Sequence, residues 1–209
     1  MSLLRLRQHT NPLTAANLRP RAGRLPLRAG AEVEVEVGCG DARFLIERAR
    51  VVPDAHLVGL EIRDEVAELA RQGAALAGVT LDIVVTNANV DLVTVFEPGA
   101  VRRAFVNFPD PWFKKRHHKR RLVTPELAAD LTSRLCPGGE LFFQSDIWDT
   151  ALDAMAVLES IPGLRNARGP WSFYRQNPYG ARSDREAVCE ADGKPIWRIL
   201  YQRAAGSPA

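Results

Sequence analysis

The sequence predicts an α/β fold built on a doubly wound, mainly parallel sheet, and two observations lead to this prediction. Segments with the two-residue period of a strand alternate with segments of helical period along most of the chain, which is typical of βαβ units. The last apolar segment, Ile-Trp-Arg-Ile-Leu-Tyr after Pro195, is expected to close the sheet as an antiparallel strand. The 209 residues, with 46% hydrophobic content, suffice for one domain with a sizeable core.

The first half of the chain supplies four of the predicted strands. Residues 33–37, Val-Glu-Val-Glu-Val, alternate with period two and end in a Gly-Cys-Gly turn, and helical spacing follows over 41–50. The pattern then continues with strands at 56–61, 80–85 and 102–107, a helix at 64–77 and a short helix near 90–96.

The second half continues the alternation and then changes character. Helices are expected at 125–135 and 148–160, and a fifth strand at 139–144 follows a Pro-Gly-Gly turn at 137–139. The stretch 165–190 is rich in Pro, Gly, Asn and Arg and receives no predicted element. Residues 31–209 are thus expected to form a single domain, and residues 1–30 a basic N-terminal arm that is ordered only partly, if at all, without its partner.

Positive charge is confined to two segments of an otherwise acidic chain. Residues 1–31 contain six Arg and no acid, and residues 114–121 add six further Lys or Arg. Removing these twelve leaves 16 basic residues against 25 acidic ones, a net charge of −9 for the rest of the chain. Such a distribution indicates a polyanionic partner, with nucleic acid the leading candidate, although a solvated basic loop gives the same pattern.

Several classes of protein are disfavoured. No run of about 18 apolar residues and no signal-peptide pattern occurs, so we expect a cytoplasmic protein that does not enter a membrane. The isolated cysteines Cys39, Cys136 and Cys189 suggest neither a disulfide framework nor a zinc site. No metal is expected, because His117 and His118 have no carboxylate or thiol at ligand spacing and read better as phosphate or ribose contacts.

A cofactor site is predicted where the first two strands end. Glycines at Gly38 and Gly40, directly after Glu36, let the backbone approach a ligand as it turns into a helix. Glu61 ends the second strand about 20 residues later, where an acid can accept hydrogen bonds from both hydroxyls of a ribose. Together these residues point to a cofactor that contains adenosine.

S-Adenosylmethionine suits this pattern better than a dinucleotide. A dinucleotide fingerprint requires a third glycine, but that position is Arg43. S-Adenosylmethionine has no pyrophosphate and carries an amino group that Glu36 could hold. Glu36 could instead continue the alternation of Glu32 and Glu34 as a wet strand face, but a central parallel strand is normally covered on both faces.

The segment "NFPDPWFKKRHHKRR", Asn107 to Arg121, fixes Asp110 between two prolines and ends in eight residues that are all Lys, Arg or His. Its first part resembles the Asn-Pro-Pro-Tyr loop of amino-methylating nucleic-acid methyltransferases. The whole segment resembles the hallmark of the bacterial tRNA (guanine-N7-)-methyltransferase family, which modifies guanine 46 in the variable loop of tRNA. The resemblance runs from about Glu32 to the C-terminus and implies a Rossmann-like class I methyltransferase fold that uses S-adenosylmethionine.

The resemblance also implies roles for individual residues. Glu36 and Glu61 match the cofactor-contacting acids, and Asp110 matches the catalytic acid and is also expected to contact the cofactor. Asn87 stands where the family usually has Asp and would bond the adenine edge. Matches to substrate-contacting residues are Lys114, Asp146 and the run Ser183, Asp184, Arg185 and Glu186, in which Ser183 replaces a Thr. The segment that engages tRNA comprises Arg116, His117, His118, Lys119, Arg120 and Arg121.

The chemistry of the predicted reaction requires little from the protein. Guanine N7 has an in-plane lone pair, so it attacks a sulfonium methyl group without first losing a proton. A carboxylate at Asp110 could grip the guanine N1–H and N2 donors and offset the positive charge that grows on the purine. Asp110 could also simply form a turn, as Asp often does beside proline, and Trp112 could either stack on a flipped-out base or pack within the loop.

Two other function classes stay open. One is a non-catalytic RNA-binding module on a methyltransferase fold, and the other is a methyltransferase that acts on another nucleic acid or on a small molecule. The sequence does not give the oligomeric state, monomer or homodimer, the tRNAs preferred, or whether the basic arm contacts RNA.

Overall fold

The computed structural model describes residues 10–205 of the chain. The elements of the first half are β1 Val33–Val37, α1 Arg43–Val51, β2 His56–Glu61, α2 Asp64–Ala77, β3 Asp82–Val85, α3 Ala88–Val95 and β4 Val101–Asn107. Those of the second half are the 3₁₀ helix η1 Lys115–Arg120, α4 Pro125–Arg134, β5 Leu135–Ser145, α5 Trp148–Glu159, β6 Leu164–Asn166, α6 Asp184–Ala191 and β7 Trp197–Arg203.

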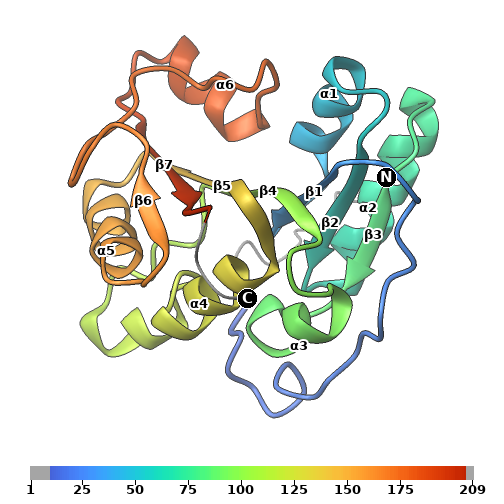
Figure 1. Cartoon of the computed structure of the whole chain (residues 1–209), viewed down its shortest axis with the longest axis horizontal. Coiled ribbons are helices and arrows are strands. Elements are labelled where there is room, and N and C mark those ends of the chain that lie inside the picture. The colour runs from blue at the N-terminus through green and yellow to red at the C-terminus, as the bar shows by residue number, and fades with distance from the viewer. Residues whose placement is uncertain (1–9, 206–209) are drawn as a thin grey trace, which may run out of the picture.

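One sheet organises the molecule, with strand order β3-β2-β1-β4-β5-β7-β6. Strands β1 to β5 pair in parallel, and β7 is antiparallel to both of its neighbours. Helices α1 and α2 lie on one face of the sheet and α3, α4 and α5 on the other (Figure 1). The predicted doubly wound sheet with an antiparallel C-terminal strand is therefore confirmed.

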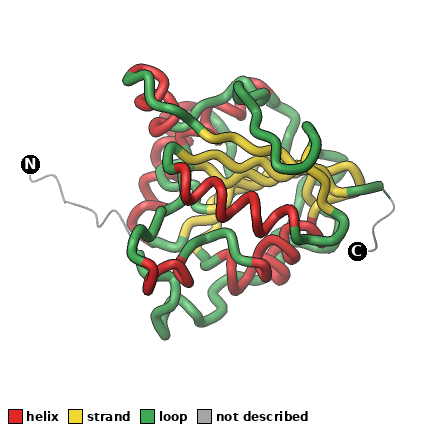
Figure 2. The backbone as a smooth tube through the Cα atoms, turned by 90° about the vertical axis from the view of Figure 1, so that its left-hand side faces the viewer, coloured by secondary structure: helices red, strands yellow, loops and turns green. Residues whose placement is uncertain are grey.

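Helices lie on both sides of the sheet (Figure 2), and each face of the sheet has its own apolar core. Because successive strand residues point to opposite faces, Val35 and Val37 pack toward α3, α4 and α5, whereas Phe105 and Phe142 pack toward α1 and α2. All five residues of β1 are buried, including its two glutamates. The alternative of a wet strand face is therefore wrong, and β1 is covered on both faces as expected for a central parallel strand.

Three regions of the chain differ from the sequence-based predictions. Strand β5 begins at Leu135 rather than 139, because Leu135 already pairs with Val101 before the register shifts at the Pro-Gly-Gly turn. The Pro- and Gly-rich stretch that received no prediction contains β6 and α6. The basic run is not plain loop, since Lys115–Arg120 forms a short 3₁₀ helix.

The described part of the arm, residues 10–30, follows the surface of α3 and reaches the start of β2 (Figure 1). The N–H groups of Arg21 and Ala22 donate to Asp91 Oδ2 at 2.8 and 3.1 Å. Further along, the N–H of Arg28 donates to His56 Nδ1 at 2.9 Å. These contacts fasten residues 21–28 to the domain. Two arginines of the predicted basic arm, Arg5 and Arg7, lie outside the described residues.

Within residues 10–205, no helix combines the length and the apolar character needed to cross a membrane.

Candidate active site

A pocket opens at the carboxyl ends of β1, β2 and β4, where ligands bind in doubly wound sheets. Four of the six residues predicted to contact the cofactor line it: Gly38, Glu61, Asn87 and Asp110. Glu36 and Gly40 are not lining residues, but Asn107, which donates to Glu36, lines the pocket. The structure therefore brings together residues that are up to 72 positions apart in the chain. Other lining residues include Arg63, Trp112 and Arg120.

The turn after β1 forms one wall of the pocket. Gly38 and Gly40 have φ angles of 75° and 57°, a left-handed conformation that a larger residue adopts only with strain. The N–H of Gly38 donates to the carbonyl oxygen of Leu60 at 2.8 Å, and the N–H of Gly40 donates to Glu61 Oε2 at 3.0 Å. The glycines thus tie the ends of β1 and β2 together at the position that the sequence predicts.

Glu36 is a buried carboxylate with one unused oxygen. Its side chain accepts a hydrogen bond from Asn107 Nδ2 at 2.7 Å through Oε1, whereas Oε2 is buried and finds no hydrogen-bond partner among the described residues. Burial raises the pKa of Glu36 to about 8, with smaller increases from Asp41 and Glu61 and an opposing effect of the Asn107 bond. This site suits a cationic group that supplies N–H donors.

Glu34, two residues earlier on the same strand face, shows what a structural carboxylate looks like here. It is also fully buried, but Arg48 donates to it through Nε and Nη2 at 2.7 and 2.8 Å. Arg103 adds a third bond at 2.8 Å. Burying a charge without a cation is costly, so the contrast between Glu34 and Glu36 marks Glu36 as incomplete without a ligand.

Glu61, the predicted ribose acid, is also buried, and its oxygens are already in use. Besides the Gly40 bond, Oε1 accepts from the N–H and Nε of Arg63 at 3.0 and 2.8 Å, and Oε2 accepts from Arg63 Nη2 at 3.2 Å. The hydrogen bond to Glu61 raises the pKa of Arg63. A ribose bound by Glu61 would have to take the place of this guanidinium group.

Asn87, predicted to bond an adenine edge, is the N-cap of α3. Its Oδ1 accepts from the N–H of Asn89 at 3.1 Å, which satisfies the first turn of the helix. Its Nδ2 donates to the carbonyl oxygens of Pro12 and Asn17 at 3.1 and 3.0 Å. The amide of Asn87 therefore links the arm to the pocket in this structure, and its contact with adenine stays a prediction.

The loop that carries Asp110 has an unusual backbone. Phe108 and Trp112, on either side of Pro109-Asp110-Pro111, have φ angles of 46° and 45°, which non-glycine residues rarely adopt. The N–H of Phe108 donates to the carbonyl oxygen of Gln144 at 2.8 Å and anchors the loop to β5. Strained residues of this kind concentrate at functional sites, and here they hold Asp110 at the pocket wall.

The basic segment divides into outward and inward cations. Lys114, Arg116 and Lys119 are exposed. Arg121 is largely buried, donates to the carbonyl oxygen of Pro111 at 3.1 Å and pairs with Asp153. Arg121 therefore has a structural role in holding the loop, and it could bind tRNA as predicted only by giving up these contacts.

Two further members of the basic segment surround Trp112. The guanidinium carbon of Arg120 lies 5.1 Å from the centroid of the Trp112 ring, and the His117 ring meets it edge-on at 5.9 Å. Local desolvation and the charges of neighbouring cations lower the pKa of His117, which favours a neutral imidazole. Trp112 thus packs within the loop and also faces the pocket, so both of its predicted roles find support in the geometry.

The predicted substrate residues near the C-terminus form a second cluster. Ser183 caps α6, where its Oγ accepts from the N–H of Glu186 at 3.2 Å. Arg185 pairs with Asp146, which follows β5. Asp184 is exposed, but Glu186 is completely buried and accepts hydrogen bonds from Gln144 and Arg198, both at 2.8 Å. Direct contact with a substrate is therefore open to Asp184 and Arg185, whereas Glu186 lies behind them.

Sequence reasoning missed Gln144 and Arg198, and gave Asn107 no separate role. Asn107, Gln144 and Arg198 are paired in register across β4, β5 and β7, and together they connect Glu36 to Glu186. The sequence signal that could have revealed Asn107 and Gln144 is a polar residue near the end of an otherwise apolar strand, as where Gln144 directly follows Leu-Phe-Phe. Among residues 10–205, no three His, Cys, Asp or Glu side chains cluster in a way that could hold a metal ion.

Comparison with known proteins gives consistent results. A family model described as "Putative methyltransferase" matches residues 31–199. A tRNA (guanine-N(7)-)-methyltransferase of Synechococcus sp. (strain JA-3-3Ab) is 38% identical over 205 residues, which cover 95% of this chain and 86% of the relative. The protein of the same name from Nostoc sp. (strain PCC 7120 / SAG 25.82 / UTEX 2576) is 32% identical over 216 residues, covering 98% and 97%.

Solved structures share the fold at low sequence identity. An aminoglycoside resistance methyltransferase, NpmB1, superposes with a TM-score of 0.52 at 17% identity and covers 83% of this chain and 87% of that one. A SAM-dependent O-methyltransferase from Thermotoga maritima gives a TM-score of 0.54 at 17% identity, covering 86% and 62%.

Proposed function

The chain belongs to the tRNA (guanine-N(7)-)-methyltransferase family, as its sequence predicts, and on this premise we propose that it transfers a methyl group from S-adenosylmethionine to N7 of guanine 46 in the variable loop of tRNA. The premise rests on relatives that match nearly the whole chain. The same proposal places the protein in the cytoplasm, where its tRNA substrate is found.

The observation that carries the proposal is the unused oxygen of Glu36. A buried carboxylate that lacks a cation among the described residues fits the ammonium group of a methionine moiety, which supplies both positive charge and N–H donors. The glycine turn beside it leaves room for a ligand backbone to approach. Glu36 and the adjacent glycine turn therefore fit S-adenosylmethionine.

Glu61 would hold the ribose of the donor. Its carboxylate lies at the carboxyl end of β2, next to the Gly40 N–H, and lines the pocket, as does Asn107, which donates to Glu36. In place of Arg63, two ribose hydroxyls would donate to its oxygens. The freed guanidinium group of Arg63 would remain near Asp110, whose charge already contributes to the raised pKa of Arg63.

Bound S-adenosylmethionine supplies an electrophilic methyl group on a positively charged sulfur. The protein contributes orientation and electrostatics, because guanine N7 needs no general base. Asp110, held by Pro109 and Pro111, would accept hydrogen bonds from the guanine N1–H and N2 amino group and stabilise the positive charge that develops on the purine. The strained backbone at Phe108 and Trp112 supports a role that depends on fixed placement.

The exposed cations of the basic segment would bind the tRNA backbone. Lys114, Arg116 and Lys119 face solvent beside the pocket and are free of the internal ion pair that holds Arg121. The first turn of α6, capped by Ser183, would present Asp184 and Arg185 to the substrate. In this proposal the exposed cations bind the tRNA backbone, and Asp110 positions the guanine base.

The direct test is methylation of an unmodified tRNA transcript by the purified protein. We expect 7-methylguanosine at position 46, detected by mass spectrometry of nuclease fragments, and dependence on added S-adenosylmethionine. Binding of the donor and of tRNA without methyl transfer would instead identify a non-catalytic RNA-binding module. Methylation confined to ribosomal RNA or DNA would contradict the tRNA assignment while leaving the chemistry intact.

A further inference from the structure

A row of buried polar side chains crosses three neighbouring strands next to the site. Asn107 of β4 pairs in register with Gln144 of β5, and Gln144 pairs in register with Arg198 of β7. Gln144 is completely buried and Arg198 is 5% exposed. Polar groups at such depth are retained where their hydrogen bonds are complete, so each bond of this row constrains the next.

The row has a fixed direction because one end is a pure donor. Arg198 Nε donates to Gln144 Oε1 at 3.1 Å, and a guanidinium group cannot accept a hydrogen bond. The amide nitrogen of Gln144 must therefore face the other way, where it donates to Asn107 Oδ1 at 2.9 Å and to Glu186 at 2.8 Å. With its oxygen engaged, Asn107 presents its nitrogen to Glu36 at 2.7 Å.

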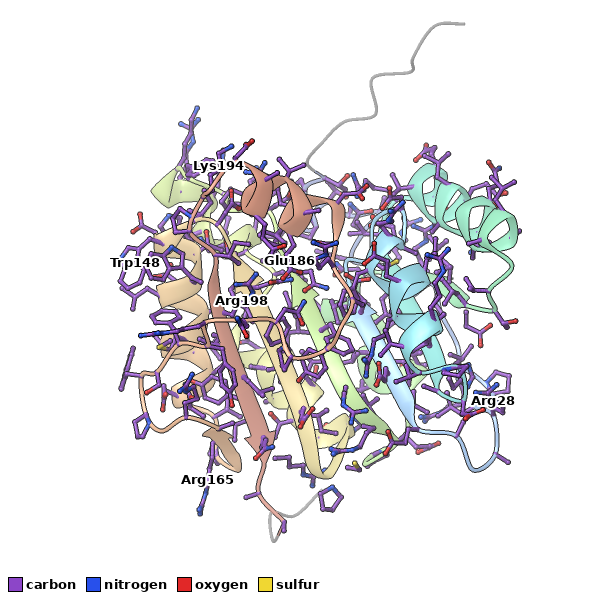
Figure 3. All side chains as sticks on the ribbon, turned by 90° about the horizontal axis from the view of Figure 1, so that it is seen from above. Arg28, Trp148, Arg165, Glu186, Lys194 and Arg198 are labelled. Carbon is purple, nitrogen blue, oxygen red and sulfur yellow. The ribbon has the colours of Figure 1, made fainter. Side chains whose placement is uncertain are left out.

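Arg198 is itself held firmly in place. Its Nη2 donates to Glu186 at 2.8 Å and to Glu190 at 3.2 Å, and its Nη1 donates to the carbonyl oxygen of Arg175 at 3.0 Å. Figure 3 shows Glu186 of α6 beside Arg198 of β7. The guanidinium group therefore has one orientation, and the two amides that follow it inherit theirs.

We propose that Arg198 is a positioning residue for the methyl donor, acting through Gln144 and Asn107 to keep an N–H donor on one oxygen of Glu36 and leave the other oxygen for the donor's ammonium group. The proposal rests on the proposed function, because it assumes that S-adenosylmethionine binds with its amino group at Glu36. It assigns a role in the reaction to a residue that lies outside the pocket lining and three hydrogen bonds away from Glu36.

Reversing the two amides shows why their direction matters. A reversed Asn107 would place Oδ1 against the Glu36 carboxylate, and two acceptors can share a hydrogen bond only if the carboxyl group keeps its proton. A protonated Glu36 cannot form an ion pair with an ammonium group. A cation at position 198 thus favours the form of Glu36 that recognises the donor.

A purely structural reading treats Arg198 as the partner of Glu186 that attaches α6 to the sheet. The two readings differ in what they predict for ligands with and without the amino-acid end. If Arg198 acts through Glu36, its loss weakens binding only of ligands that carry the ammonium group. If it merely supports the fold, all ligands of the pocket are affected alike.

The experiment compares S-adenosylhomocysteine with 5′-methylthioadenosine, which lacks the amino-acid end, by titration calorimetry. The variant Arg198→Gln/Glu186→Gln removes the cation without leaving an unpaired buried carboxylate. Arg198→Lys retains a pure donor, and Arg203→Gln alters another buried arginine of β7 that donates to the carbonyl oxygens of Ser133 and Leu135. The variant Arg203→Gln therefore controls for a general loss of stability.

We expect the double variant to bind S-adenosylhomocysteine about tenfold more weakly, the value of one charged hydrogen bond, and 5′-methylthioadenosine within about twofold of wild type. Arg198→Lys should recover most of the loss, and Arg203→Gln should preserve the ratio of the two affinities. Equal weakening for both ligands, or no weakening for either, would overturn the positioning role. A wild-type protein that binds neither ligand would instead contradict the proposed function on which the inference rests.

Discussion

Glu34 and Glu36 lie two residues apart on one face of strand β1, both buried, and only Glu34 is neutralised by arginine. Strand neighbours on the same face share the same depth in the sheet, so burial alone does not distinguish them. Arg48 and Arg103 complete the first carboxylate, whereas the second has an amide on one oxygen and no hydrogen-bond partner on the other within the described residues. This difference between the two residues underlies the first two predictions.

Replacing Glu36 with Gln should stabilise the ligand-free protein at alkaline pH. Because its pKa is raised from 4.5 to about 8, the native state holds a proton that the unfolded state has lost, and wild-type stability falls as pH rises through this window. Glutamine never ionises and avoids the loss, whose upper limit is about 5 kcal/mol at ~1.4 kcal/mol per pKa unit. Urea unfolding at pH 5 and pH 8.5 measures the difference, with exposed Glu32→Gln as the control. Parallel pH profiles of Glu36→Gln and wild type would contradict it.

Donor binding should release a proton at neutral pH. The Glu36 carboxyl, with a pKa of about 8, is mostly protonated at pH 7 and must ionise to pair with the ammonium group. Calorimetric titration with S-adenosylhomocysteine in buffers of different ionisation enthalpy should therefore show release of roughly one proton. Binding of 5′-methylthioadenosine should release none. A wild-type enthalpy that does not depend on the buffer would remove Glu36 from ammonium recognition.

Glu61→Ala should weaken donor binding without affecting tRNA. Loss of one or two charged hydrogen bonds to the ribose corresponds to an increase in Kd for S-adenosylmethionine of about tenfold or more. The affinity for tRNA, measured by filter binding, should hardly change, because Glu61 is buried behind Arg63. Glu65→Ala in the first turn of α2 serves as the control. Unchanged donor affinity in Glu61→Ala would reduce Glu61 to the structural partner of Arg63.

The exposed cations should determine how tRNA binding depends on salt. Each phosphate contact that is lost should reduce the slope of log K against log salt by about 0.7 to 0.9, so Lys114→Ala/Arg116→Ala/Lys119→Ala should bind weakly and with a flatter slope. Donor affinity should be preserved. Arg165→Ala, on the edge strand β6 (Figure 3), should leave the slope unchanged. A triple variant with the wild-type slope would place the tRNA backbone elsewhere.

The sequence predicts the sheet and the positions of Glu36 and Glu61 near the carboxyl ends of β1 and β2 well, because local patterns encode them. The alternation over 33–37 and the glycine turn mark β1 and its end without reference to distant residues. Helix α6 escaped prediction because its apolar signal is weak and lies in a Pro- and Gly-rich stretch. The capping pattern of Ser183 and Glu186 was interpreted only as substrate contact.

Other features depend on long-range pairing that one sequence does not reveal. The link from Glu36 to Arg198 requires the register of β7 against β5, which joins residues 54 positions apart. The sequence of the basic segment likewise does not show which of its side chains point to solvent and which point inward. Lys119 and Arg121 are both cations within the same basic run. In the structure, however, Lys119 is exposed, whereas Arg121 contacts Pro111 and Asp153.

The central claim is that the proline-held carboxylate of Asp110 acts on the reacting guanine, and single-turnover methyl transfer tests it most directly. Asp110→Asn retains the size and turn-forming tendency of the residue but removes its charge and replaces one acceptor oxygen with a donor. Asp54→Asn, which also alters an aspartate next to a proline, is the matched control at an exposed turn. With tRNA and S-adenosylmethionine both saturating, we predict that Asp110→Asn forms 7-methylguanosine about 10² times more slowly, a loss of roughly 3 kcal/mol of transition-state stabilisation, while Asp54→Asn reacts at the wild-type rate. A near-normal rate in Asp110→Asn would contradict the account, because it would mean that Asp110 only shapes the loop.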